Sequence, residues 1–246
     1  MAEYLIQSET LDAIADAINA KTGKSASMTP AEMVTEIESI ETGTEITDGI
    51  VFTELNASGS PIKADVYGNL PEYAFGYNSV GGLLGSALTN VTFKTPLTSI
   101  GWGAFQRTAL TELIIPDSVI GVGGEVLRAN TAPVRYVHEN AGSQYGYKES
   151  SVKALNQISN VSSVQLGAVG KPLTDLYYQF MTSRAYASMT LTIYCIGANV
   201  DSFLASARRA ITEGTIVFKA SSDTEYNGMT YAAGDTILTS EVESTS

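Results

Sequence analysis

The chain has 246 residues, which suffices for one large domain or for about two to three small ones. Its 14 Lys and Arg residues against 26 Asp and Glu residues give a net charge of −12. The basic face that nucleic-acid phosphates require is therefore not indicated. A single cysteine excludes an internal disulfide, and one His with one Cys excludes the usual zinc ligand sets within one chain.

Uncharged polar residues take an unusually large share of the composition. Charged residues make up 16% of the chain, against about 25% in typical soluble domains. Ser, Thr, Gly and Tyr fill the difference, which favours exposed β-structure and broad protein contacts. The amino terminus has neither the basic nor the apolar region of a signal peptide, and no apolar run approaches the ~18 residues of a membrane span. We therefore expect synthesis in a cytosol, no visible export signal and no membrane insertion.

Residues 1–42 are expected to form a helical hairpin that acts as a docking module. Apolar residues recur at helical spacing within residues 11–18, and Gly23 ends that pattern. The sequence TPAE at 29–32 is a capping box with Pro at the first helical position, so it starts a second helix. Each helix would be about three turns long, too short to be stable alone in water. The hairpin must pack either on itself or on a partner, and the sequence leaves both alternatives open.

Residues 43–69 are expected to form a linker followed by a β-hairpin. The linker is polar and contains Gly and Thr. Two strand-like segments, 49–53 and 62–67, flank the turn residues 56–61, and the second segment alternates apolar and polar residues as a half-buried strand does.

Residues 70–140 carry an imperfect repeat. LTNVTF at 88–93 and LTELII at 110–115 match in pattern, with a spacing of twenty-odd positions. Between them, IGWGAF at 100–105 supplies a compact turn whose Ala-Phe pair can point into a stacked core. A period of this length is typical of a leucine-rich solenoid.

Two weaker copies flank the clear repeat. LPEYAF at 70–75 parallels the turn at 100–105, and a Gly-rich insertion separates the two. A third, worn copy covers 120–137. Three imperfect units are about the minimum for a stable stack.

Two resemblances follow from these segments. LTSIGWGAF at 97–105 and LTELIIPDSV at 110–119 resemble the BspA-type leucine-rich repeat, L-x-x-I-G-x-x-A-F followed by L-x-x-L-x-I-P-x-S-V. The segment at 8–40 resembles one that recurs in structural proteins of tailed phages of Gram-positive bacteria, where it often precedes such repeats. Together the resemblances cover 8–40 and 70–140, less than half of the chain. These resemblances imply a protein of the virion or of the cell surface that is used for attachment. They assign no catalytic residue to this chain.

Residues 141–200 show no legible repeat and are expected to be a degenerate repeat or cap region. Strand-like residues occupy 161–166 and 191–196. Helices are expected over 150–158 and over 173–184. A terminal cap is expected because the last repeat of a solenoid otherwise exposes an apolar end.

Residues 201–246 are expected to form a C-terminal helix and a β-hairpin tail. Apolar residues of 200–213 share one side of a helix, and Gly214 would stop it. The pair Asn227-Gly228 between short β segments is typical of a tight hairpin turn. The whole chain is therefore expected to belong to a multi-part α+β class.

Sequence patterns for chemistry are absent. The chain has no GxxxxGK[ST], HExxH or GxSxG motif, so we expect no cofactor and no metal. Cys195, in an apolar run, is interpreted as a small buried residue rather than a nucleophile, and His138 as a solvated loop residue rather than a catalytic one. The carboxylate pairs Asp12/Asp16 and Glu36/Glu38 are interpreted as solvated helix faces.

Four aromatic residues are the candidate interaction surface: Tyr73, Tyr77, Trp102 and Tyr136. Aromatic side chains on a solenoid face can stack on sugars or anchor a protein partner. The alternative is that they pack within the stack or its turn layer, and the sequence leaves this open.

The sequence therefore predicts a non-enzymatic structural protein of a tailed-phage virion, located on the tail, baseplate or fibre and presenting its repeats for host attachment or subunit contacts. The expected partners are other virion proteins and further copies of the chain, with a host cell-surface glycan or protein as another candidate. The alternative is a fragment of a bacterial cell-surface leucine-rich-repeat adhesin. A glycan-processing enzyme would need two carboxylates across a cleft, and the sequence nominates no such pair.

Overall fold

The structure, a computed structural model, describes residues 15–16, 29, 49–76, 86–143, 155, 158, 160–176 and 188–243. Contacts divide the chain into two units, Met1–Ile46 and Thr47–Ser246. Of the first unit, Ala15 and Asp16 are described as helical and Thr29 as irregular. The fold given below is that of the second unit.

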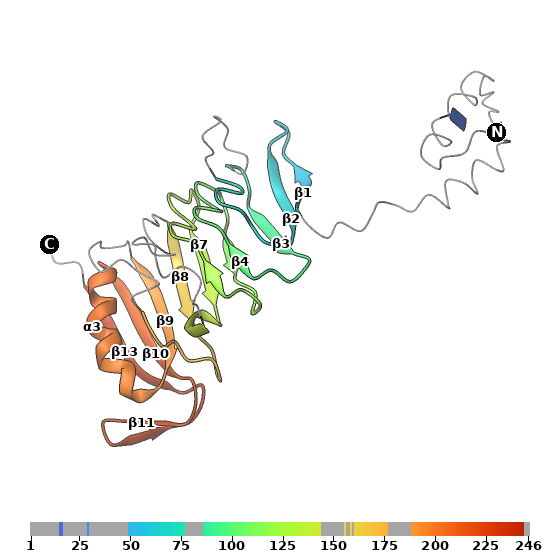
Figure 1. The fold of residues 1–246 in the computed structure, drawn as a ribbon. Helices are drawn as coiled ribbons and strands as arrows, with labels where there is room; N and C mark the ends of the chain where they lie inside the picture. The colour runs from blue at the N-terminus through green and yellow to red at the C-terminus, as the bar shows by residue number, and fades with distance from the viewer. Residues whose placement is uncertain are drawn as a thin grey trace, which may run out of the picture. The chain divides into compact units, whose positions relative to one another are not determined.

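The second unit is built almost entirely of short strands (Figure 1). In chain order its elements are β1 Gly49–Leu55, β2 Pro61–Tyr67, β3 Asn90–Phe93, β4 Ser99–Ile100, β5 Glu112–Ile114, β6 Gly121–Val122, β7 Val134–His138, η1 Ala141–Ser143, β8 Val161–Leu166, β9 Met189–Cys195, η2 Gly197–Asn199, α3 Val200–Ala210, β10 Gly214–Ala220, β11 Thr224–Tyr226, β12 Met229–Tyr231 and β13 Thr236–Val242.

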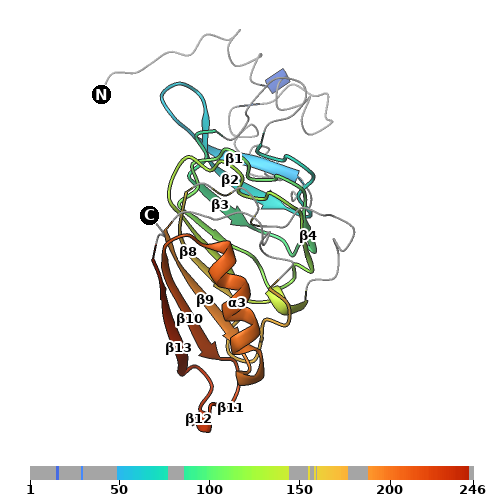
Figure 2. The same ribbon diagram turned by 90° about the vertical axis from the view of Figure 1, so that its left-hand side faces the viewer.

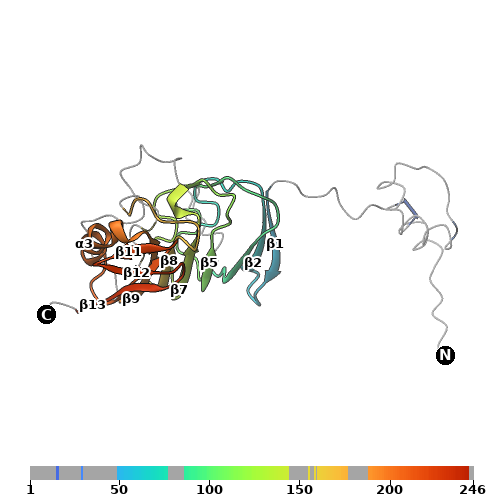
Figure 3. The same ribbon diagram turned by 90° about the horizontal axis from the view of Figure 1, so that it is seen from below.

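Parallel strands stack side by side in the main sheet. The sheet has six strands in the order β13-β10-β9-β8-β7-β5. Its strands from β5 to β10 are parallel, and β13 closes one edge antiparallel to β10. Seen from below, the strands line one side of the stack and the turns line the other (Figure 3). The chain therefore winds in successive coils, each contributing one strand.

A second, smaller column of backbone pairing runs opposite the main sheet. β4 pairs in parallel with β6 of the following coil, and Leu70 bridges in parallel to Ile100 of β4. At Gly101 an added Cβ would overlap the backbone of Pro71 and Glu72. Gly123, the next residue of this column, would meet the backbone of Trp102 in the same way. Glycine is required at both positions because successive coils approach at backbone distance.

The turns after this column repeat their backbone conformation. Tyr73, Gly103 and Glu125, in what we call the first, second and third coils, all have positive φ. Hydrogen bonds between coils align them, such as the Gly103 N–H to the Gly124 carbonyl at 2.9 Å. Left-handed residues return four positions later at Arg107 and Ala129 in the second and third coils. The sequence period is therefore matched by a repeated turn geometry as well as by repeated strands.

The amino-terminal end of the second unit is an antiparallel hairpin joined to a parallel strand. β1 pairs with β2, and β2 pairs in parallel with β3. The Asn56 side chain accepts hydrogen bonds from the Ser58 and Ser60 backbone N–H groups at 2.9 Å, which fixes the turn between β1 and β2. The hairpin expected over residues 49–67 is confirmed.

One continuous apolar core runs through the coils, from Ala64 to Ile237. Phe75 and Phe105, the same turn position in two coils, stack with ring centroids 5.3 Å apart and are fully buried. The prediction that the Ala-Phe pair at 104–105 points into the core is confirmed. In the third coil, the buried Asn130 side chain donates to the Leu110 carbonyl at 3.0 Å and accepts from the Thr108 hydroxyl at 2.9 Å.

At the carboxyl-terminal end, a helix replaces the second column. η2 and α3 connect β9 to the parallel strand β10, and α3 lies across these strands (Figure 2). The buried helix residues Phe203 and Ala207 belong to the same core cluster as Leu191 and Phe218 of the sheet. The helix therefore covers the inner face of the last strands, where no further coil supplies cover.

The α+β class expected from the sequence is wrong. The described part of the chain is mostly β-sheet, and α3 is the one α-helix that lies wholly within the described residues. The described residues show no N-terminal helical hairpin, and nearly all of residues 1–42 lie outside them. The physical reason in the second and third coils is the backbone pairing on the turn side. β4 pairs there with β6, and Gly101 and Gly123 bring successive coils to backbone distance, which the wider cross-section of a helix would not allow.

Two further predictions for the carboxyl-terminal half are confirmed, and a third is wrong for the residues that the structure describes. The helix expected at 200–213 is confirmed but ends at Ala210, since Ile211 is already extended. The hairpin turn is confirmed, with positive φ at both Asn227 and Gly228. Residues 173–176 are not helical. The remainder of the helix expected at 173–184, and most of that at 150–158, lies outside the described residues.

Candidate interaction surface

The six-stranded sheet presents one face to the core and the opposite face outward. Side chains alternate along each strand, so every second residue of β8, β9 and β10 points away from the core. The strand registers align these outward residues into cross-strand rows. One row reads Glu112, Arg135, Ser163, Thr190, Thr215 and Glu241. The next reads Ile114, Val137, Gln165, Thr192, Val217 and Thr239. We call this surface the outer strand face.

Uncharged polar side chains occupy the centre of the outer strand face. We call them the hydroxyl patch: Ser163, Gln165, Thr190, Thr192, Thr215 and Thr239. All six are half-buried or exposed. Thr215 donates to Glu241 at 2.9 Å, and Gln165 donates to the Gly167 carbonyl at 3.3 Å. The remaining side chains, all hydroxyls, make no side-chain hydrogen bond within the described part of the chain, so their donors and acceptors face solvent.

Charged groups border the patch rather than enter it. Glu112 and Arg135, on β5 and β7, form an ion pair at 2.6 Å. At the opposite end Glu241 lies on β13, and Lys219 lies on β10 with its ammonium 5.9 Å from the centroid of the Tyr194 ring. The centre of the face is therefore neutral, in a chain of net charge −12.

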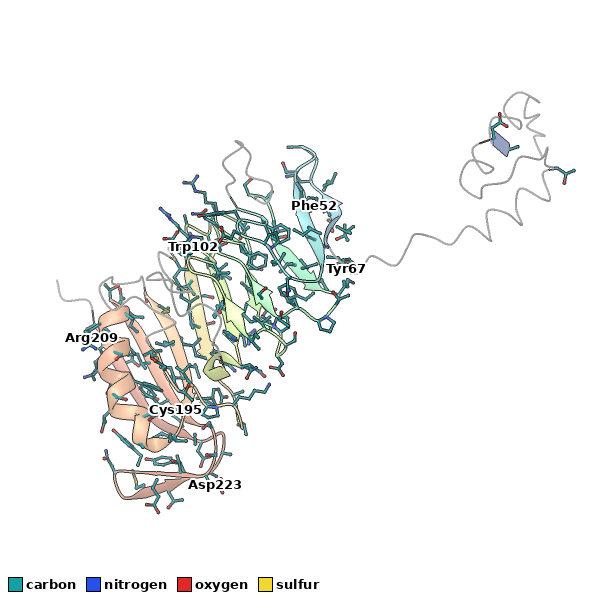
Figure 4. The ribbon with its side chains drawn as sticks, in the orientation of Figure 1. Phe52, Tyr67, Trp102, Cys195, Arg209 and Asp223 are labelled. Carbon is teal, nitrogen blue, oxygen red and sulfur yellow. The ribbon has the colours of Figure 1, made fainter. Side chains whose placement is uncertain are left out.

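Two of the four predicted aromatic residues lie together in the turn layer. The Tyr73 N–H donates to the Trp102 carbonyl at 2.7 Å, and both residues are half-buried. The Tyr73 ring covers Gly103, where an added Cβ would approach its Cε1 to 2.8 Å. Trp102 lies among the turns, on the side opposite the strands (Figure 4). Both residues therefore lie on the turn surface, separate from the outer strand face.

The other two predicted aromatic residues do not join that surface. Tyr136 is fully buried on the inner side of β7, so its placement on an interaction surface is wrong. Burial raises the pKa of its phenol well above the ordinary value. The reason is the strand period, which places residue 136 on the same face as the buried Val134. Tyr77 lies outside the described residues.

His138 is also buried, which corrects the interpretation of it as a solvated loop residue. It ends β7 with no exposed surface, and its Nδ1 lies 3.3 Å from the Tyr136 hydroxyl. Burial lowers the pKa of its imidazole to about 4, although the nearby Asp117 carboxylate acts in the opposite direction. The ring is therefore neutral at pH 7.

Cys195 is buried at the end of β9, on the inner side of the sheet (Figure 4). Burial raises the pKa of its thiol to about 12. The reactive thiolate is therefore not formed at neutral pH, and the prediction of a small buried residue is confirmed.

A groove of about 630 Å³ lies at the amino-terminal end of the second column. Its lining combines the start of β1, the segment before the first turn, and β4 with the glycine after it: Gly49, Ile50, Asn69, Leu70, Pro71, Glu72, Ser99 and Gly101. Glu72 is the one charged residue in this lining. The Asn69 side chain already accepts hydrogen bonds from the Thr98 and Ser99 N–H groups, at 2.7 and 3.0 Å.

The sequence reasoning missed the hydroxyl patch, although part of the signal was present. The segment MTLTIYC at 189–195 alternates apolar and polar residues, which assigns Thr190, Thr192 and Tyr194 to one face. The alternation does not predict the strand register. It is the register that brings Ser163 of β8 and Thr215 of β10 beside Thr190.

No group of three or more His, Cys, Asp or Glu side chains is placed to hold a metal ion within the described ranges. Of the helices in that same part of the chain, none combines the length and apolar character needed to cross a membrane.

The comparisons with known proteins give no relative. No protein-family model matches the chain, and neither a curated protein nor a solved structure matches it.

Proposed function

We propose that this chain is a non-enzymatic structural protein of a tailed-phage particle, which assembles on the tail, baseplate or fibre and uses the outer strand face for attachment. The observation that carries the proposal is the hydroxyl patch. It is an ordered polar surface, and most of its hydroxyls make no side-chain hydrogen bond to the described residues. The resemblance of residues 97–105 and 110–119 to BspA-type repeats supports the attachment role, because proteins with such repeats are used at surfaces.

The fold supports a presenting role for this face. Its strands are held from behind by a continuous core and by α3, so the outward side chains are fixed in rows. A surface placed on strands is more rigid than one placed on loops. Rigid rows lower the entropy lost when a partner binds.

The location in a particle is tested by immunogold labelling. An antibody raised against the purified chain is applied to phage particles from the bacterium that carries this sequence, followed by negative-stain microscopy. Gold on the tail, baseplate or fibre is expected. The same antibody preincubated with purified chain is the control. Unlabelled particles would contradict the proposal, and label on uninfected cells would favour the adhesin alternative.

The role of the outer strand face is tested with one matched pair of variants. Thr192→Lys places a charge at the centre of the hydroxyl patch. Thr230→Lys makes the same change at an exposed residue of β12, away from the patch. Binding of labelled protein to host cells should fall with Thr192→Lys and stay unchanged with Thr230→Lys.

A further inference from the structure

We infer that the hydroxyl patch binds a neutral polysaccharide, an inference that rests on the proposed attachment function and names the chemistry of its ligand. The first argument is charge. The six patch residues carry no charge, although the chain as a whole is strongly acidic. An anionic ligand would meet no cation at the centre, and a cationic ligand no carboxylate. The charges at the border are the Glu112–Arg135 ion pair, the Glu241 carboxylate, which accepts a hydrogen bond from Thr215 at 2.9 Å, and Lys219 beside the Tyr194 ring.

The second argument is hydrogen-bonding capacity. The hydroxyls of Ser163, Thr190, Thr192 and Thr239 can each donate and accept. Neighbouring strands lie ~4.8 Å apart, and alternate residues along one strand are ~7 Å apart. A chain-like ligand that crosses the strands along Ser163, Thr190 and Thr215 therefore meets a hydroxyl on each of three neighbouring strands. In the adjacent row, Val217 lies between Thr192 and Thr239. A polymer of uncharged sugars has hydroxyl groups along its whole length, so it can form hydrogen bonds with each side chain of such a row of hydroxyls.

The third argument separates a glycan from a protein partner. Residues that dominate protein–protein affinity are mainly Trp, Tyr and Arg, whereas Ser, Thr and Val are under-represented. The patch contains no Trp, Tyr or Arg and consists mostly of Ser and Thr. The exposed apolar residues Phe52, Leu55 and Met229 lie on other elements, and the exposed Ile114 lies at the β5 edge of the outer strand face. Arg135 and Tyr194 lie at the border of the patch. The hydroxyl patch itself thus lacks the anchors of a tight protein interface.

The margin of the patch adds an apolar surface. Tyr194 follows Thr192 on the same face of β9 and is half-buried. An aromatic ring beside hydroxyl groups offers apolar contact to the C–H side of a sugar ring. Because each net hydrogen bond adds little to affinity, one site is expected to bind weakly. Several copies on one particle would raise the overall affinity.

The test uses the full chain on a printed array of neutral and acidic oligosaccharides, followed by titration of the bound glycans. Neutral glycans should bind. Thr192→Lys should weaken that binding at least tenfold, with Thr230→Lys unchanged. Circular dichroism shows whether Thr192→Lys is folded, and Thr192→Val, which removes only the hydroxyl, should weaken binding about three- to tenfold.

Other outcomes overturn the inference. Binding confined to acidic glycans, or equal binding by wild type and Thr192→Lys, would contradict it. If no glycan binds and attachment to host cells survives periodate but not protease, the partner is a protein. In that case the inference fails while the proposed attachment function stands. Absence of gold label on particles would instead refute the proposed function, whatever the array shows.

Discussion

The coils around β5 and β7 and the region from β8 to β13 continue one sheet but close their crossovers in different ways. In the second and third coils, β4 and β6 pair on the far side of the coil, and turns built on Gly101 and Gly123 make the return. Between β9 and β10, η2 with α3 makes the return. The recognisable repeat therefore coincides with the coils whose turn side carries β4 and β6, whereas the sheet continues beyond it on strands that alternate inward and outward residues.

The largest expected effect tests whether both regions share one core. Phe105→Ala in the second coil and Phe218→Ala in β10 each remove a fully buried ring. Each should cost about 3–5 kcal/mol of unfolding free energy. Because one core cluster contains both residues, urea unfolding followed by circular dichroism should show the same transition moving in both variants. Two transitions, each sensitive to only one variant, would mean that the regions fold separately.

The next effect is confined to the turn side of the coils. Gly123→Ala places a Cβ against the backbone of Gly101 and Trp102, so we expect a loss of about 3 kcal/mol. Ser99→Ala, in the same column, is the control and should change stability by less than ~0.5 kcal/mol. Thermal unfolding of both variants gives the comparison. An unaffected Gly123→Ala protein would show that the coils are not held at backbone distance.

A third effect concerns the polar interior of the third coil. Asn130→Ala removes hydrogen bonds to the Leu110 and Ala132 carbonyls and to the Thr108 hydroxyl. Buried groups without partners cost about 1–3 kcal/mol each, so a loss of about 2 kcal/mol is expected by urea denaturation. Asn160→Ala removes one amide donor at a more exposed residue and should cost less than half as much. Equal costs would contradict the importance of burial.

The smallest stability effect is the pH dependence from His138. Its pKa is about 4 when folded and 6.5 unfolded, so the unfolded chain binds more protons between these values. Folding stability therefore falls as pH decreases from about 6.5 to 4. At pH 5.5 this contributes a loss of roughly 1.4 kcal/mol relative to pH 8. The difference between those two pH values should shrink by that amount in His138→Gln, and an unchanged difference would refute the burial of a neutral imidazole.

Local patterns anticipated the parts of the fold that depend on neighbouring residues. The alternation of apolar and polar residues predicted the hairpin of β1 and β2, and the helical spacing of apolar residues predicted α3. The Asn-Gly pair predicted the hairpin turn at Asn227-Gly228. The prediction of an α+β class was wrong because the described part of the chain is mostly β-sheet. There, α3 is the one α-helix that lies wholly within the described residues. Tyr136 was misassigned although its position two residues after the core residue Val134 marks it as inward-facing.

The candidate surface was harder to anticipate than the fold. Thr190 and Thr192 are recognisable as one face of one strand. Their neighbours come from the preceding and following strands of the sheet, which are distant in the sequence, and the pairing of β7 with β8 also contains an irregularity. Sequence periodicity constrains the face of a residue but not the partner beside it. The hydroxyl patch therefore became visible only with the strand pairing.

The most direct test of the central claim is cell binding by three labelled proteins at equal concentration. Wild type and Thr230→Lys should bind host cells equally, and Thr192→Lys should bind at least tenfold less, with all three showing the same circular dichroism spectrum. Equal binding by all three would place attachment elsewhere on the molecule and contradict the assignment of the outer strand face.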